Sequence, residues 1–290
     1  MNDPSWMTGL DHPVVAVADM AAARAAYERL GFTIPGLGSH VEWGTGNWCI
    51  MFERDYLELR GVVRPGRTHN LDQFLEHYGE GLMGLALGTR DAHVSHRELC
   101  SRGFHPREVQ RLTRNFELPG ETVQLQFSLC FLDESESGGL MSTVFCQHLT
   151  PKRLRRPEWL RHANGAVGVQ AVTGVVADLD AASEVQSRLF GRDKVVRDAD
   201  AVVVDAGPAA IRLLSAAAAR KRYPEAADLL AAGRPRLIAI TLATRSLAAA
   251  KSLFDAGGVE YRAAADGIVA PPRYAAGAIL EFVQSSEAAA

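Results

Sequence analysis

The chain has 290 residues, of which 47% are hydrophobic and 22% charged, and its formal net charge is −3. This composition excludes global disorder, and a pI near 6.3 gives no electrostatic basis for binding nucleic acid. The length predicts about two domains. No segment is long and apolar enough to cross a membrane, and the N-terminus lacks the pattern of a secretory signal. The four cysteines are widely spaced, so we expect reduced thiols and a cytoplasmic location.

A repeat organises the chain into four units of roughly 70 residues. Each copy contains an apolar strand, a capping residue, an amphipathic helix and a glycine, and the copies are residues 10–32, 81–104, 168–191 and 236–259. The side chain of the capping residue can accept an unpaired N–H at the start of each helix. The predicted caps are Asp19, Asp91, Asp178 and Ser246. The glycines expected to end the helices in the left-handed conformation are Gly31, Gly103, Gly191 and Gly257.

Short strand-like segments follow each helix, so every unit is predicted to be βαβββ. The fold class is therefore α+β, with four βαβββ modules paired into two larger mixed β-sheets. We place an N-terminal domain at 8–149, formed by modules 10–62 and 81–149. A basic linker at 150–165 then leads to a C-terminal domain at 166–285, formed by modules 167–215 and 236–285. The basic residues of the linker are expected on a solvated surface, and an anionic partner is the alternative.

The modules resemble the vicinal oxygen chelate superfamily and, within it, the glyoxalase-like domain proteins. The segments that carry the resemblance are LDHPVVAVADMAAARAAYERLGF (10–32), WGTGN (43–47), YLEL (56–59), CQHLTP (146–151) and RPEWLRHANGA (156–166). The resemblance implies that the two mixed sheets are curled, each around a cleft between paired modules, where a divalent metal is held by residues on the first and last strands of a module. Lyases, isomerases, dioxygenases, epimerases and drug-sequestering proteins share this fold.

The resemblance assigns metal-ligand positions to His12, seven residues before the Asp19 cap, and to Glu58. Period-two alternation independently predicts that Tyr56, Glu58 and Arg60 face the cleft. The alternatives are a solvated or capping histidine at the strand entrance and an ion pair between Glu58 and Arg60.

The second module offers fewer ligands. Counting back from Arg90 puts Met83 at the position of His12, and thioether sulfur is a poor ligand for a hard cation. His148 on the last strand is the predicted third ligand, and Gln147, which is also a predicted substrate-binding residue, replaces it if the register differs by one residue. The set of His12, Glu58 and His148 would suit Fe, Mn, Ni or Zn.

Other residues are predicted to bind substrate or move a proton. Tyr56 is the candidate proton shuttle beside Glu58. Trp43, Asn47 and Trp48 surround a predicted turn at 44–46 and would line the cleft mouth, with hairpin packing as the alternative. Gln124 and Gln126 would point into the cleft if their apolar neighbours lie under a helix. Otherwise they lie on a solvated face.

The C-terminal modules have lost most ligand positions. Ala171 and Ile238 stand where His12 does in the first module, and Arg212 stands at the third module's equivalent of Glu58. Only Glu281 retains the acidic residue, and we expect it to pair with Arg212.

The favoured function is a divalent-metal enzyme, an isomerase, lyase or dioxygenase, acting on a small oxygen-bearing organic substrate. The alternative is a metal-free protein that binds or sequesters a small hydrophobic molecule, with Trp43 and Trp48 as stacking walls. The expected partner is a small molecule, without nucleic acid or membrane, and a homodimer is compatible with the sequence.

Overall fold

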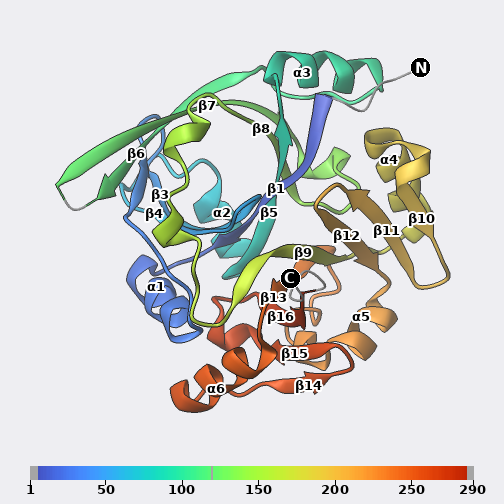
Figure 1. Cartoon of the computed structure of the whole chain (residues 1–290). Helices are drawn as coiled ribbons and strands as arrows, with labels where there is room; N and C mark the ends of the chain where they lie inside the picture. The colour runs from blue at the N-terminus through green and yellow to red at the C-terminus, as the bar shows by residue number, and fades with distance from the viewer. Residues whose placement is uncertain (1–5, 119, 286–290) are drawn as a thin grey trace.

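The computed structural model describes residues 6–118 and 120–285, which form two eight-stranded β-sheets and six α-helices (Figure 1). Each module has the predicted order of one strand, one helix and three strands. The module helices are α1 (Met20–Arg29), α3 (Ala92–Ser101), α4 (Leu179–Phe190) and α6 (Leu247–Gly257). Two further helices, α2 (Leu71–Tyr78) and α5 (Ala216–Arg222), connect the modules within each pair. None of the helices in the described ranges is long and apolar enough to span a membrane.

The first two modules form a closed barrel in the order β1-β4-β3-β2-β6-β7-β8-β5. Its strands are β1 (Met7–Ala16), β2 (Gly38–His40), β3 (Thr45–Met51), β4 (Tyr56–Val62), β5 (Gly81–Thr89), β6 (Gln110–Leu118), β7 (Glu121–Leu132) and β8 (Ser142–His148). The first strands of the two modules, β1 and β5, pair antiparallel. Closure places the inward-facing side chains of all eight strands around one enclosed interior. The turn before β3 lies at 41–44, so Thr45 and Gly46, predicted in that turn, already belong to β3.

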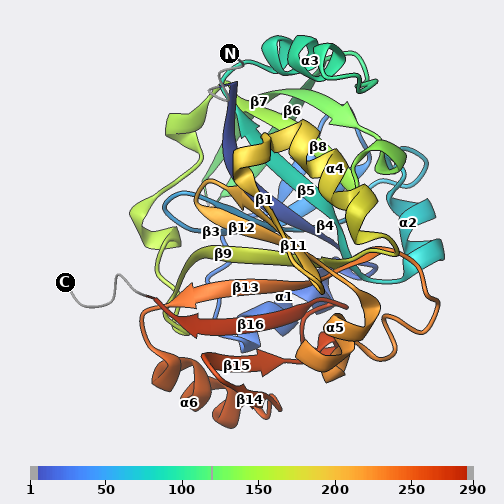
Figure 2. The same cartoon turned by 90° about the vertical axis from the view of Figure 1, so that its right-hand side faces the viewer.

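The last two modules form an open sheet in the order β10-β11-β12-β9-β13-β16-β15-β14. Its strands are β9 (Ala166–Val175), β10 (Val195–Arg197), β11 (Ala201–Ala206), β12 (Ala209–Leu214), β13 (Arg236–Thr244), β14 (Arg262–Ala264), β15 (Gly267–Ala270) and β16 (Ile279–Gln284). As in the barrel, the two first strands of the modules pair antiparallel at the centre. In Figure 2 the strands β9, β13, β16 and β15 of this sheet lie below the barrel, and β12 and β11 rise in front of it.

The four predicted caps are confirmed. Each capping side chain accepts a hydrogen bond from a backbone N–H in the first turn of its helix. A glycine with positive φ follows three helices at the predicted positions, Gly31, Gly103 and Gly191, although Gly191, with a ψ of 145°, is not in the left-handed helical conformation. In the fourth module the prediction is one residue early, since Gly257 is helical and Gly258 takes the left-handed conformation.

A continuous apolar core joins the barrel and the open sheet. Phe32, just after α1, packs against Phe282 of β16, and the Tyr27 hydroxyl donates to the Ala275 carbonyl at 3.2 Å. His162 ties the connecting segment to the barrel, because its Nδ1 accepts from the Thr33 N–H and its Nε2 donates to the Met51 carbonyl, both at 3.0 Å. The second sheet therefore supports the barrel from one side.

Candidate functional site

An irregularity in β1 creates the most polar part of the barrel interior. Leu10 lies opposite Leu87 of β5 and His12 lies opposite Ala86, so Asp11 is an extra residue in β1. A bulge of this kind breaks the alternation of faces and turns two consecutive side chains to the same side. As a result, Asp11 Oδ1 lies 2.8 Å from the Nδ1 of His12.

His12 and Glu58 meet inside the barrel. His12 Nε2 is 3.1 Å from Glu58 Oε2, and both side chains are more than nine-tenths buried. Tyr56 stacks on the His12 ring with a centroid distance of 4.0 Å, and its hydroxyl lies 3.3 Å from the same Nε2. The predicted alternation of β4 is confirmed: Leu57 and Leu59 pack in the outer core, while Tyr56, Glu58 and Arg60 face inward.

Each charge in this cluster has a compensating partner. Burial opposes the protonated form of His12, but its bonds to Asp11 and Glu58 outweigh this effect and raise its pKa above the ordinary value. Burial would also raise the pKa of Glu58, but its bond with His12 and attraction to Arg60 hold that pKa well below its usual range. His12 thus lies between two ionised carboxylates, Asp11 and Glu58, and forms an ion pair with each.

Glu58 is oriented by a neighbouring amide. Asn47 Nδ2 donates to Glu58 Oε1 at 3.0 Å, which leaves Oε2 to face His12. On the other side of Asn47, His40 Nε2 lies 3.5 Å from the same amide nitrogen, and its Nδ1 lies 2.8 Å from Thr45 Oγ1. Burial, with repulsion from Arg60, lowers the pKa of His40 to about 3, so this imidazole is neutral at physiological pH.

His148 faces inward, as predicted, but does not join His12 and Glu58. Its Nε2 lies 2.7 Å from Asp11 Oδ2, so Asp11 stands between the two histidines. Within residues 6–118 and 120–285, the one set of three or more His, Cys, Asp or Glu residues whose ligand atoms all lie within 4.8 Å of one another is Asp11, Cys146 and His148. The predicted set of His12, Glu58 and His148 is therefore not assembled around one point.

The second module contributes no equivalent ligands. His12 lies opposite Ala86, and Val14 lies opposite Gly84. When the second module is superposed on the first with the cap Asp91 on the cap Asp19, Gly84 takes the position of His12. In the same way, Glu58 lies opposite Val14 and corresponds to Val144, which lies opposite Ala86. The assignment of Met83 is therefore wrong by one residue, because the cap that sets the count is Asp91 and not Arg90.

Close packing explains the glycine at position 84. A Cβ there would lie 2.0 Å from the Ser142 carbonyl oxygen on β8. We expect Gly84→Ala to lower the free energy of unfolding by about 1–3 kcal/mol, since the two strands must separate. Urea denaturation checks this, with Gly257→Ala as the control, because a Cβ at 257 would approach the flexible Arg29 side chain at 3.1 Å and backbone only at the ordinary contact distance of 3.5 Å. Equal stability of both variants would contradict the packing argument.

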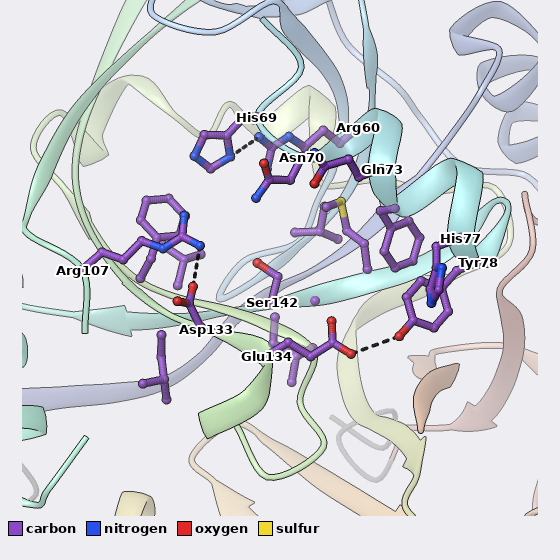
Figure 3. Close-up of a pocket in the computed structure, with 18 of the residues that line it drawn as sticks. Arg60, His69, Asn70, Gln73, His77, Tyr78, Arg107, Asp133, Glu134 and Ser142 are labelled. Atoms are coloured by element: carbon purple, nitrogen blue, oxygen red, sulfur yellow. Dashed lines mark hydrogen bonds and ion pairs between the residues drawn. The ribbon is translucent and has the colours of Figure 1, made fainter. Parts of the chain in front are cut away.

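A cavity of about 50 Å³ lies beside the cluster, and His12, Glu58 and Tyr56 line it. A larger pocket of about 740 Å³ opens next to it under α2 (Figure 3). Val14, Arg60, Phe131 and Val144 line both spaces, so these side chains are the partition between them. At this partition Arg60 Nη2 lies 3.4 Å from His69 Nδ1. Asp11 and His148 do not line the cavity and therefore form a layer behind His12.

A comparison with protein families identifies the chain. The profile of the glyoxalase-like domain matches residues 10–190, which cover the barrel from residue 10 of β1 onward together with β9 and α4 of the open sheet. The chain belongs to the glyoxalase-like domain family. A search of curated proteins found no match.

Solved structures share the fold of this glyoxalase-like protein over nearly all of its length. A hypothetical protein from Staphylococcus aureus has a TM-score of 0.70 at 12% identity, with 95% of this chain and 99% of that chain covered. A triple mutant of 4-hydroxymandelate synthase from Streptomyces coelicolor has a TM-score of 0.59 at 11% identity, covering 96% and 92%. A xylose isomerase-like TIM barrel/4-hydroxyphenylpyruvate dioxygenase fusion protein has a TM-score of 0.57 at 15% identity, covering 97% and 49%. These likenesses show that the chain shares its fold with these proteins.

Several predicted substrate-binding residues of the glyoxalase-like barrel lie outside its interior. Trp48 donates to the Met20 carbonyl on α1 at 2.9 Å, and the Gln147 side chain accepts from the Ala92 N–H on α3 at 3.2 Å. Gln124 and Gln126 are exposed, because Leu125, Phe127 and Leu129 form the inner face of β7. Solvent, and not a helix, covers the polar face here. Trp43 and Asn47 do line the inner cavity.

The acidic residue retained in the open sheet has a structural role. Glu281 is bound by the Arg222 guanidinium at 3.0 Å, the Tyr223 hydroxyl at 2.9 Å and the Thr241 hydroxyl at 2.7 Å. The expected pairing with Arg212 is wrong, since Arg212 instead lies 3.4 Å from Thr241 Oγ1. A carboxylate with this many donors has little capacity left for a metal.

The pair His12 and Glu58 fits a divalent metal better than the second set, Asp11, Cys146 and His148, which lies behind that pair. Those two offer a nitrogen and an oxygen that face the cavity, with Asp11 as the outer carboxylate that commonly steadies a ligating histidine. In the second set, Asp11 is already hydrogen-bonded to two histidines, His12 and His148. Burial also raises the pKa of the Cys146 thiol well above its ordinary value. The thiolate required of a cysteine ligand is therefore disfavoured there.

Proposed function

We propose that this glyoxalase-like protein is an enzyme that binds a divalent metal, Fe, Mn, Ni or Zn, through His12 and Glu58. Its substrate is a small oxygen-bearing organic molecule, and the reaction is an isomerisation, a lyase reaction or a dioxygenation. The observation that supports this most is the pairing of His12 Nε2 with Glu58 Oε2 at 3.1 Å on the wall of the inner cavity.

The protein's own groups would prepare this chemistry. A bound divalent ion supplies a Lewis acid that stabilises negative charge on substrate oxygens. Asp11 accepts the Nδ1 proton of His12 and so keeps Nε2 directed at the cavity, while Asn47 orients Glu58. The Tyr56 hydroxyl, 3.3 Å from Nε2, is placed to hold or transfer a proton. The side chains of His12, Asn47, Tyr56 and Glu58 are each more than nine-tenths buried, which limits their contact with bulk water.

Elemental analysis of the purified protein tests the proposal. The protein is produced in medium supplemented with Fe, Mn, Ni and Zn, and metal is measured after gel filtration. About one equivalent of a single metal is the expected result. A protein that stays metal-free after supplementation, and after reconstitution with each ion, would contradict the proposal.

Asp11→Asn is expected to weaken the affinity for the metal by about 10- to 100-fold, since it removes the carboxylate behind His12 without removing a ligand. Competition with a chelating dye measures this affinity. Asp133→Asn, at a half-exposed carboxylate of the outer pocket, is the control. If both variants bound the metal as tightly as the wild type, Asp11 would have no supporting role.

A metal-free binding protein is the second candidate. It is favoured by Gly84 and Val144, which leave the second module without ligands, and by the aromatic walls Trp43 and Phe131 of the cavity. The elemental analysis separates the two candidates, because only the first requires a stoichiometric metal.

A further inference from the structure

Arg114 on β6 is the least satisfied charged group in the barrel. Its side chain is 98% buried, yet its hydrogen bond from Nη1 goes to the thiol of Cys49, at 3.1 Å. Its Nε and Nη2 have no hydrogen-bond partner. Within the described ranges, no carboxylate forms an ion pair with this guanidinium.

Neither neighbouring group neutralises this charge. Burial raises the pKa of Cys49 to about 12, so its side chain is a neutral thiol. The rings of Phe116 and Phe127 lie 5.9 and 5.4 Å from the guanidinium carbon, which gives a weak cation–π contribution. A buried guanidinium with unsatisfied donors is costly for the fold, so a structural role does not account for Arg114.

The two free donors define the shape of a ligand. Nε and Nη2 lie along one edge of the planar guanidinium, and their two N–H groups point in nearly parallel directions. A carboxylate matches this edge with two parallel hydrogen bonds, one to each oxygen.

Arg114 also lines the inner cavity, together with His12 and Glu58. The lining includes two guanidinium groups, Arg60 and Arg114, against the one carboxylate of Glu58, which favours an anionic guest. About 50 Å³ holds a carboxylate head group but not a whole metabolite. The remainder of a larger acid would pass the Arg60 partition into the pocket of about 740 Å³.

The backbone beside Arg114 is shaped to admit it. A Cβ on Gly38 of β2 would lie 2.9 Å from Arg114 Cδ and 2.1 Å from Asn47 Oδ1. Glycine at this position therefore gives space to both the buried guanidinium and the amide that orients Glu58.

We propose that Arg114 is a substrate-binding residue that recognises a carboxylate, and hence that the natural ligand of the barrel is an organic carboxylic acid. Only the assignment of this acid as a substrate depends on the proposed metal chemistry. Carboxylate binding itself does not.

Binding is tested on the full chain after chelator treatment, by calorimetry, with a panel of acetate, benzoate, phenylacetate and phenylpyruvate. The neutral amides of the first three acids and inorganic phosphate are the comparison ligands. At least one acid is expected to bind about 10-fold or more tightly than its comparison ligand. The comparison ligand is the amide for the first three acids and phosphate for phenylpyruvate. The reason is that a bidentate charged pair contributes more than a neutral hydrogen bond.

Arg114→Met should abolish the preference for the acid and leave the melting temperature equal or higher, because it removes an unpaired buried charge. Arg114→Lys should retain part of the affinity. Arg111→Gln, on the exposed face of the same strand, is the matched control and should bind like the wild type.

The proposal is overturned if no acid in the panel binds preferentially, if Arg114→Met binds as the wild type does, or if phosphate binds more tightly than every acid. A fall in melting temperature in Arg114→Met, with unchanged discrimination, would assign the residue to structure. Because the protein is stripped of metal, failure here is distinct from an absence of metal in the untreated protein.

Discussion

His12→Ala and Glu58→Ala are each expected to lower the metal content of the purified protein from about one equivalent to less than about a tenth. The second module offers only Gly84 and Val144 at the corresponding positions, so either substitution leaves one of the two proposed ligands. We expect the affinity for the metal to fall by at least about 100-fold, which is more than for Asp11→Asn, a change at a supporting residue. Turnover should be lost together with the metal. Elemental analysis and chelator competition measure the effect.

A matched control separates ligand loss from unfolding. Glu281→Gln changes the same residue type at the corresponding strand position of the fourth module, where Arg222, Tyr223 and Thr241 already bind the carboxylate. Its metal content should match the wild type. The milder variants His12→Gln and Glu58→Gln preserve side-chain volume, since removing one partner of a buried pair is destabilising. Full metal occupancy in a folded variant at either position would refute the assignment.

Asp55→Asn is expected to remove a pH-dependent loss of stability. Asp55 is buried where β4 begins and accepts the Val169 N–H of β9 at 3.0 Å, so it joins the barrel to the open sheet. Burial raises the pKa of its carboxyl to about 7, although the Val169 N–H, Arg155 and Arg54 oppose the shift. Between the ordinary value of 3.8 and about 7, the folded protein holds a proton that the unfolded chain has released. Stability therefore falls as the pH rises through this window.

Asparagine retains an acceptor for the Val169 N–H without a charge. At pH 8.5 the variant should be more stable than the wild type by on the order of 2–4 kcal/mol, and near pH 4 the two should be alike. Urea denaturation across this range checks the prediction, with Asp266→Asn at an exposed position as the control. A constant difference between Asp55→Asn and the wild type at all pH values would contradict the argument.

Much of the fold could be predicted because its signals are local. Capping residues, helical periodicity and terminal glycines recur at four places in the chain, and each depends on hydrogen bonds within a few residues. The alternation of β4 also predicted the inward side of Glu58, since Leu57 and Leu59 are apolar on a strand covered by a helix.

The same reasoning failed on β7, because alternation separates two faces without saying which one is inside. The glutamines face solvent on an uncovered part of the barrel, and the apolar residues face the cavity. Arg114 was missed for a related reason, although a signal was present: it occupies an apolar position between Leu112 and Phe116 in the alternating pattern of β6. A charged residue at such a position is a useful pointer to a buried binding group.

By itself the sequence determined the four modules, their pairing into two sheets and the presence of His12 and Glu58 on strands that face a cleft. The modules and the inward side of Glu58 follow from periodicity and capping, which act over a few residues, whereas the cleft and the position of His12 were implied by the family resemblance. Only the tertiary structure decided that a bulge brings Asp11 beside His12, that His148 binds Asp11 and not the cavity, and that Arg114 is enclosed without a partner. Strand register and barrel closure join residues more than a hundred positions apart, and no local pattern encodes which of them meet.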